Sequence, residues 1–131
     1  MASILLDTTV VIDLLRGRPG ARSRVAGHRA ARDELYVCAI NIEATVRGLR
    51  PAEEAAAGSL FSGLRLAPLG VDEGRRAGVW RREFARRGRT LTQADSLVAA
   101  AAVGIGARLA TENPRDFPMR GLNVDHWPVG T

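Results

Sequence analysis

Short apolar runs recur along this chain and are separated by segments with helical periodicity. Residues 3–7 and 35–38 have little polar interruption, and residues 108–111 form a further strand candidate late in the chain. Runs of this length that are apolar throughout are typical of buried parallel strands. Residues 64–69 and 122–124 are weaker strand candidates of the same kind.

The segments between these runs predict helices that begin at capping residues and end at glycine or proline. They are residues 10–15, 21–32 and 41–47, a helix opened by Pro51, residues 72–87, and a helix that begins after Thr92 and ends near Gly104. Alternation of strands and helices predicts an α/β fold, a three-layer arrangement with a parallel sheet and helices on both faces. At 131 residues we expect one domain, residues 1–131.

Four acidic residues stand close to the points where strands give way to helices. Asp7 ends the first strand, Glu43 follows the second, Asp116 follows the fourth, and Asp95 lies in the first turn of the helix after Thr92. The carboxyl ends of parallel strands share one edge of the sheet, so these side chains are expected to gather there. Gathered carboxylates repel one another. Such a cluster therefore indicates a hard cation, Mg²⁺ with Mn²⁺ as the alternative.

Each acid also has a simpler explanation. Asp7 could be a helix cap, and Asp95 could be a first-turn acid favoured by the helix dipole. Glu43 is more informative because its neighbours are apolar and an unpaired charge among them is costly. Asp13 lies about two turns beyond Asp7, and we expect it on a solvated face or paired with Arg16.

The charge of the chain narrows its possible chemistry. The net charge is +5, and all 19 basic residues are arginine. The absence of lysine excludes Walker A loops, Schiff-base chemistry and the lysine of receiver domains. Arginine binds phosphate through paired hydrogen bonds, and the positive excess favours a polyanionic partner.

The remaining features favour a reduced, cytoplasmic protein. Cys38 is the single cysteine and lies in an apolar run, so we expect a buried thiol and no intrachain disulfide. Residues 96–107 are the longest stretch of low charge, shorter than the about 20 residues that a membrane span needs, so no membrane partner is expected. His28 and His126 lack metal-ligand spacing and are expected at the surface.

Four segments together resemble PIN-domain ribonucleases, specifically the VapC-type toxins of bacterial toxin–antitoxin pairs. An acid ends the first strand and a hydroxyl residue follows two places on; a glutamate lies in an Asn-Ile-Glu-Ala segment; an aspartate lies in a helix start; and a Thr-Glu-Asn-Pro-Arg-Asp-Phe segment follows the last clear strand. These segments span residues 5–117 in the order of the family: residues 5–15, residues 41–44 with Gly48, residues 92–101 and residues 109–117.

The resemblance implies a role for each acid. Asp7 and Asp95 would be the principal metal ligands, and Glu43 would complete the pocket and orient or deprotonate the attacking water. In the fourth segment both Asn113 and Asp116 fall on positions where relatives place functional residues. We favour Asp116 as the charged catalytic member.

Polar residues beside these acids would support them. The resemblance implies that Thr9 and Thr111 hold the acids through their hydroxyls, with Asn113 as a polar helper. Several arginines crowd one predicted helix and its end, and they form either a solvated face or a track for an RNA backbone. The candidates for RNA contact are Arg81, Arg82, Arg86, Arg87 and Arg89.

The resemblance further implies a Mg²⁺-dependent endoribonuclease that hydrolyses RNA phosphodiester bonds and is neutralised by a cognate antitoxin protein. Members of the family commonly form homodimers, and the helices between Asn41 and Leu60 are candidates for that interface and for the antitoxin groove. The alternative is an α/β module that binds RNA or a protein through the same acidic rim without cleaving. A receiver domain is disfavoured by the lack of lysine and by the presence of Glu43 and Asp95.

Overall fold

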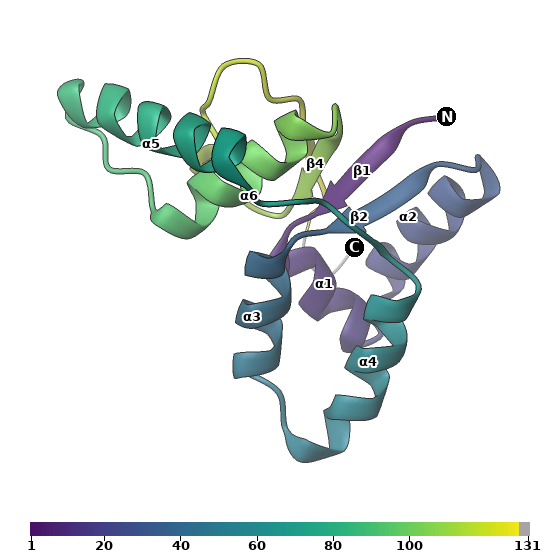
Figure 1. The fold of residues 1–131 in the computed structure, drawn as a ribbon. Coiled ribbons are helices and arrows are strands. Elements are labelled where there is room, and N and C mark those ends of the chain that lie inside the picture. The colour runs from purple at the N-terminus through teal and green to yellow at the C-terminus, as the bar shows by residue number, and fades with distance from the viewer. Residues whose placement is uncertain (129–131) are drawn as a thin grey trace.

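Five parallel strands form the central sheet of the computed structural model, which describes residues 1–128 (Figure 1). The tail 129–131, which belongs to the predicted domain, lies outside the described residues. The strand order is β3-β2-β1-β4-β5, and each neighbouring pair is parallel. The strands are β1 (Ser3–Leu6), β2 (Glu34–Val37), β3 (Arg65–Leu66), β4 (Arg108–Thr111) and β5 (Val124–His126).

Helices connect successive strands, as the alternating pattern predicts. Residues 1–128 contain six α-helices and two 3₁₀ helices. They are α1 (Thr8–Leu15), α2 (Pro19–Ala30), α3 (Ala39–Arg47), η1 (Pro51–Glu53), α4 (Glu54–Ser62), α5 (Val71–Arg86), α6 (Gln93–Gly104) and η2 (Pro114–Asp116). None of them is long and apolar enough to cross a membrane.

Both faces of the sheet are buried, which confirms the predicted three-layer α/β fold. Leu5 points to a core that includes Trp80 of α5 and the alanines of α6, whereas Ile4 and Leu6 point to a second core with Val10 of α1. This alternation follows from the two-residue period of a strand. A strand buried on both faces needs apolar side chains at every position, which explains the apolar run.

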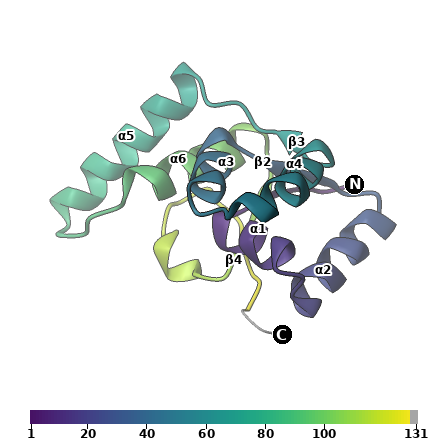
Figure 2. The same ribbon diagram turned by 90° about the horizontal axis from the view of Figure 1, so that it is seen from below.

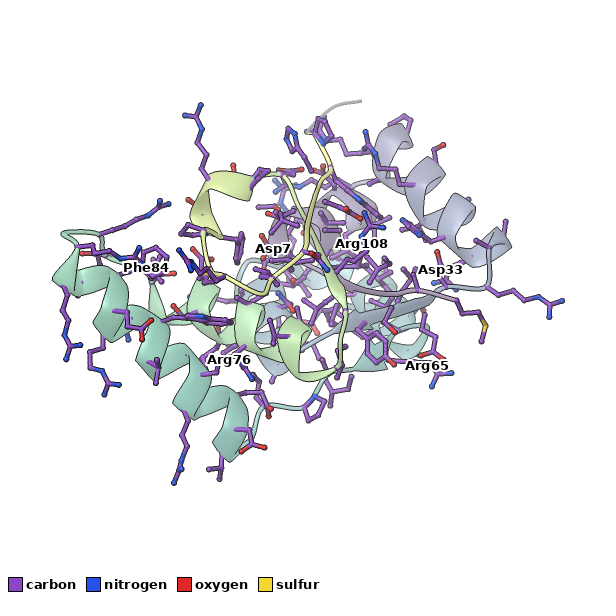
Figure 3. All side chains as sticks on the ribbon, turned by 90° about the horizontal axis from the view of Figure 1, so that it is seen from above. Asp7, Asp33, Arg65, Arg76, Phe84 and Arg108 are labelled. Atoms are coloured by element: carbon purple, nitrogen blue, oxygen red, sulfur yellow. The ribbon has the colours of Figure 1, made fainter. Side chains whose placement is uncertain are left out.

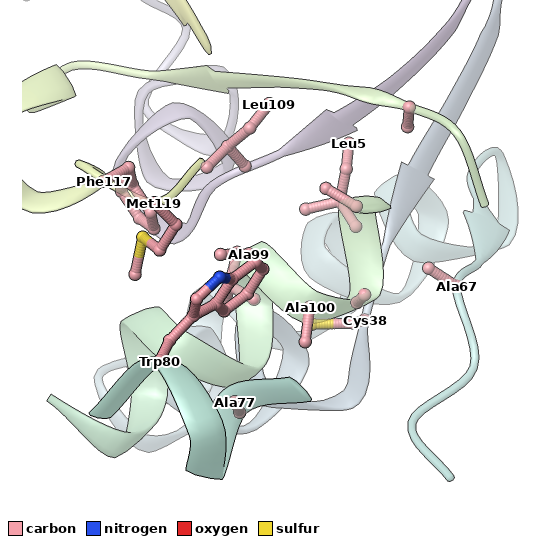
Figure 4. Packing of buried hydrophobic residues seen from close by; sticks show 14 of the residues in the cluster. Leu5, Cys38, Ala67, Ala77, Trp80, Ala99, Ala100, Leu109, Phe117 and Met119 are labelled. Carbon is pink, nitrogen blue, oxygen red and sulfur yellow. The ribbon is translucent and has the colours of Figure 1, made fainter. Parts of the chain in front are cut away.

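The two helical layers lie on opposite sides of the strands. In Figure 1, α5 and α6 lie to the upper left, and α1, α3 and α4 lie below the strands. Figure 2 shows α5 and α6 again side by side, away from α1 and α2. In the close-up of the first core, Trp80 lies against Ala99 and below Met119 and Phe117 (Figure 4).

Small side chains bring α6 close to its neighbours. Ala99, Ala100, Ala101 and Ala102 are all fully buried in the core between the sheet and α5. An alanine run allows close approach of backbones on several sides of a helix, because no bulky side chain separates them. The position of α6 in turn determines where its first turn, with Asp95, meets the sheet.

The structure assigns the caps of two helices. Asp7 is the N-cap of α1, the simpler explanation that the sequence allowed for this acid, and it accepts the Thr8 backbone N–H at 2.8 Å. The helix predicted over residues 41–47 begins two residues earlier, at Ala39. Cys38 is its N-cap, and the Asn41 side chain accepts the Cys38 backbone N–H at 2.9 Å. An asparagine at the third position of a helix can accept the backbone N–H of the N-cap residue, which otherwise has no partner.

Replacing Leu5 tests the two-sided core. Leu5→Ala removes a fully buried side chain from the central strand, and we expect a loss of about 2–5 kcal/mol in the free energy of unfolding. Leu66→Ala is the matched control, because Leu66 is 62% exposed on the edge strand β3 and its loss should change stability by less than about 0.5 kcal/mol. Urea unfolding followed by circular dichroism measures both. Equal effects would contradict the assignment of Leu5 to the core.

Candidate functional site

Asp7 lies at the junction of β1 and α1, and two neighbouring groups orient its carboxylate. Oδ1 accepts the Thr8 backbone N–H at 2.8 Å, and Oδ2 accepts the Thr111 hydroxyl at 2.7 Å. The backbone N–H of Asp7 donates to the Ala110 carbonyl at 2.9 Å, so the residue is tied to β4 at two points. Figure 3 shows Asp7 within the body of the molecule rather than on its outline.

Burial sets the electrostatics of Asp7. The residue is only 7% exposed, and the loss of solvation raises the pKa of its carboxyl above the usual 3.8. The hydrogen bonds from Thr111 and Thr8 lower this pKa in part, and the negative charge of Asp116 raises it further. The carboxylate is therefore held in a fixed orientation, but its hydrogen bonds offset only part of the cost of burying its negative charge.

Asp95 lies in the first turn of α6, directly after the Thr92 cap. The Thr92 hydroxyl accepts the Asp95 backbone N–H at 3.1 Å, as the sequence predicts. A negative charge is favoured at this end of a helix. Even so, burial raises the pKa of Asp95, and the charges of Asp7 and Asp116 raise it further.

Asp116 lies in η2, just after β4, and its side chain is exposed. Its charge acts on both Asp7 and Asp95, so the structure brings these three acids to one region at the carboxyl ends of β1 and β4. Asn113 is exposed, and its backbone N–H donates to the Thr111 hydroxyl at 3.1 Å. Asn113 thus joins the same turn, although its side-chain role stays a prediction.

Glu43 differs from its expected environment. It lies on α3 with its side chain 66% exposed, and Oε1 is 3.9 Å from an Arg47 nitrogen one turn later. The expectation of a costly charge among apolar side chains was therefore wrong. Its sequence neighbours are apolar, but the helix turns Glu43 outward while Asn41 and Thr45 face the interior. Its place in the pocket stays a prediction.

The two supporting threonines have different surroundings. Thr111 is fully buried, donates to Asp7 and accepts from Asn113, as a supporting residue should. The Thr9 hydroxyl is buried without a hydrogen-bonding partner among the described residues. The predicted support of an acid by the Thr9 hydroxyl is therefore not seen as a hydrogen bond within residues 1–128.

Asn41 is a supporting residue that the sequence did not identify as part of the site. Its side chain is fully buried, accepts from the backbone N–H of Cys38, and donates to the Thr8 hydroxyl at 3.2 Å. It therefore links the starts of α3 and α1 next to Asp7. Its only sequence signal is its position beside Glu43 in the second motif. Cys38 is buried, as predicted.

The donor set fits a hard divalent cation. Asp7, Asp95 and Asp116 offer only carboxylate oxygens, and none of them takes part in an ion pair of residues 1–128. In that part of the chain no three His, Cys, Asp or Glu side chains stand close enough to hold one ion together. Mg²⁺ takes one or two carboxylates directly and keeps several waters, so this spacing is compatible with it.

The arginines of α5 and the following loop fall into two groups. Arg81 donates through Nε to the Leu91 carbonyl at 3.2 Å, and Arg89 donates to the Arg115 carbonyl beside Asp116, so both stabilise loops next to the site. Arg87 lies over the Phe84 ring at 4.3 Å. Arg82 and Arg86 are exposed and have the freedom that a phosphate contact needs. Figure 3 shows the side chains of α5 fanning outward around Arg76 and Phe84.

The two histidines are not part of the group formed by Asp7, Asp95 and Asp116. His28 is partly buried rather than on the surface: its ring stacks on Trp127 at 5.7 Å, and Nδ1 is 2.8 Å from Asp33 Oδ2. His126 is exposed at the end of β5. His28 therefore packs near the end of β5, His126 is the last residue of β5, and neither belongs to the candidate site.

Removing the Thr111 hydroxyl tests its effect on Asp7. In Thr111→Val we expect the pKa of Asp7 to rise further, because the ionised carboxylate loses a hydrogen bond that lowers it. Thr9→Val is the matched control and should leave this pKa unchanged, since the Thr9 hydroxyl has no partner in the described residues. The carboxyl ¹³C chemical shift of Asp7, followed against pH without metal, measures both. An unchanged pKa in Thr111→Val would contradict the assigned hydrogen bond.

Comparisons with known proteins identify the family of this chain. The PIN domain family matches residues 4–119. Ribonuclease VapC19 of Mycobacterium tuberculosis is 34% identical over 88% of this chain and 92% of its own, and Ribonuclease VapC10 of the same organism is 32% identical over 88% and 86%. Among solved structures, DNA-bound VapBC from Salmonella typhimurium has a TM-score of 0.82 at 23% identity, covering 97% of this chain and 99% of that one. VapBC-1 from nontypeable Haemophilus influenzae has a TM-score of 0.79 at 21% identity, covering 95% and 98%. The chain belongs to the PIN-domain family and, within it, to the VapC type.

Proposed function

We propose that this protein is a metal-dependent endoribonuclease that hydrolyses RNA phosphodiester bonds and acts as the toxin of a toxin–antitoxin pair. The observation that carries the proposal is the convergence of Asp7, Asp95 and Asp116, none of which is in an ion pair of residues 1–128, in a chain of this family. The names of the curated relatives, which are ribonucleases, support the RNA substrate.

We assign Mg²⁺, with Mn²⁺ as an alternative, to the carboxylates of Asp7 and Asp95. The bound ion would supply Lewis acidity toward the phosphate and a more acidic water. Asp7 can act as a ligand despite its two hydrogen bonds, because each carboxylate oxygen has a second lone pair. Thr8 and Thr111 hold the carboxylate in place, so it needs little reorganisation when the substrate arrives.

Two further residues complete the proposed machinery. Asp116 is exposed beside the buried acids and is the charged member of the fourth motif, with Asn113 as a polar helper. Glu43 would orient or deprotonate the attacking water. Its pairing with Arg47 is no obstacle, because both side chains are largely exposed and such ion pairs contribute at most about 1 kcal/mol.

We infer a protein partner as well as an RNA. Two structural relatives support a cognate antitoxin: one is described as a toxin–antitoxin complex from Klebsiella pneumoniae, and the other, VapBC-5 from Mycobacterium tuberculosis, as a member of a family of toxin–antitoxin systems. The helices between Asn41 and Leu60 are the proposed surface for the antitoxin or for a second copy of the chain. Val46 on α3 is 45% exposed and would contribute apolar contact there.

Cleavage of RNA by the purified protein, freed of any partner, tests the proposal. With Mg²⁺ or Mn²⁺ we expect discrete fragments from total cellular RNA, and with EDTA we expect none. Asp7→Asn and Asp95→Asn should each reduce the rate by at least about 100-fold, because each removes a charge that holds the ion. Gel electrophoresis and sequencing of the fragment ends measure the outcome.

Asp72→Asn is the control for these variants. Asp72 is an exposed acid in the first turn of α5, so its loss changes the net charge equally without touching the three converging acids. Circular dichroism checks that every variant is folded. If RNA stays intact with either metal while the protein still binds it, the nuclease proposal is wrong and the non-catalytic binding module is the correct interpretation.

The arginine track gives a separate prediction about RNA affinity. In an Asp7→Asn background, which keeps RNA intact, Arg82→Ala with Arg86→Ala should weaken binding and reduce the slope of log Kd against log[salt] by about one for each phosphate that is no longer bound. Arg22→Ala is the control, because Arg22 is exposed on α2, on the opposite layer of the molecule. Fluorescence anisotropy at several salt concentrations measures both. An equal effect of Arg22→Ala would indicate only general charge attraction.

A further inference from the structure

Two acids outside the proposed catalytic set lie in contact at the back of the site. Asp13, on α1, is 8% exposed, and the side chain of Glu112, directly after β4, is hydrogen-bonded to it. Asp13 was expected on a solvated face or paired with Arg16, and the structure contradicts both expectations. The helical period instead directs it inward toward the end of β4.

A hydrogen bond between two carboxyl groups requires a proton. Two ionised carboxylates would repel each other, so one of the pair must be neutral and act as the donor. Glu112 Oε1 is buried and has no hydrogen-bonding partner among residues 1–128, which makes a charge on that side chain costly. Burial first, and the bond to Asp13 next, raise the pKa of Glu112 from 4.5 to about 7.

The charged groups around the pair are consistent with one shared proton. Asp13 faces Glu112 from α1, and the charge of Asp7 reaches it from the end of β1. Arg18, which follows α1, is the one cation that acts on Glu112 among the groups described, and its Nε lies 3.8 Å from Asp13 Oδ1. A pair that shares a proton carries one negative charge, which this guanidinium balances.

The location of Glu112 connects the pair to the proposed catalytic residues. It lies between Thr111, whose hydroxyl donates to Asp7, and Asn113, whose backbone N–H donates to that same hydroxyl. Anything that anchors the Glu112 side chain therefore anchors the turn that aligns Thr111. The same turn leads into η2, which bears Asp116.

We propose that Glu112 is a positioning residue: its protonated carboxyl donates to Asp13, holds the turn after β4 against α1, and thereby keeps the Thr111 hydroxyl aligned on Asp7. The effect on RNA cleavage rests on the proposed function, whereas the proton-sharing pair does not. When Glu112 ionises, repulsion from Asp13 loosens the turn. The site is thus coupled to pH through a pair that touches neither the RNA nor the ion.

The first experiment measures the pair directly in the metal-free protein. We expect the ¹³C shift of the Glu112 carboxyl to titrate near pH 7 in the wild type, and the backbone amide signals of Thr111 and Asn113 to move with the same midpoint. In Asp13→Asn the midpoint should fall, since the neighbouring negative charge is gone. A wild-type midpoint near the ordinary 4.5 would overturn the proposal.

Glu112→Gln is the matched variant, because its side-chain amide still donates to Asp13 but does not titrate. In this variant the Thr111 and Asn113 amides should no longer respond between about pH 6 and 8. Folded wild type retains a proton that the unfolded chain releases, so its stability should fall, relative to Glu112→Gln, from about pH 4.5 to about pH 7 and then stay level. If the stability difference between wild type and Glu112→Gln is the same at every pH, the proton-sharing pair of Asp13 and Glu112 is overturned.

The rate of RNA cleavage tests the positioning role of Glu112. The cleavage rate of Glu112→Gln divided by that of wild type should rise severalfold between about pH 6 and pH 8, and Glu112→Ala should be slower than Glu112→Gln at every pH because it lacks the donor. A constant ratio alongside a confirmed titration would overturn the positioning role. If no variant cleaves RNA, the proposed function fails, while the metal-free titration still decides whether the pair exists.

Discussion

The hydrogen bond from the Thr111 hydroxyl to the Asp7 carboxylate is the contact on which the candidate site depends. It joins residues 104 positions apart, at the ends of two neighbouring central strands. Without it, Asp7 would be only a helix cap with a raised pKa. With it, the carboxylate has one orientation, and the turn after β4 is held next to it. The register of β1 against β4, which aligns Leu6 with Ala110, brings the next residue of each strand together.

The electrostatics of the site combine opposing requirements. Burial and mutual repulsion raise the pKa values of Asp7 and Asp95, whereas hydrogen bonds from Thr111, Thr8 and Thr92 lower them. The fold tolerates this repulsion because β1 and α6 are fixed by large cores on both faces of the sheet. A site in which negative charge is concentrated on a rigid frame is suited to binding a cation, and the overall net charge of +5 is suited to drawing a polyanion toward the protein.

Most of the fold was predictable from local pattern. The strand at residues 108–111 was predicted with its observed limits, and the others were within a few residues. The signal is clearest for β1, because a strand buried on both faces needs apolar side chains at successive positions. The helix starts were less predictable. Several polar residues compete for each cap, and the choice at Asp7 and Cys38 was made by where the preceding strand ends.

By itself, the sequence determined the family, through the resemblance of four motifs. It also determined the parallel α/β architecture and the positions of Asp7, Asp95 and Asp116 near strand or helix ends, since these follow from local spacing. Only the tertiary structure decided which side chains face inward. It turned Glu43 out to solvent, left the Thr9 hydroxyl without a partner in the described residues, and brought Asp13 to Glu112. The physical reason is that the direction of a helical side chain and the pairing of distant charges depend on how elements pack against one another. That packing is a long-range property that local spacing does not contain.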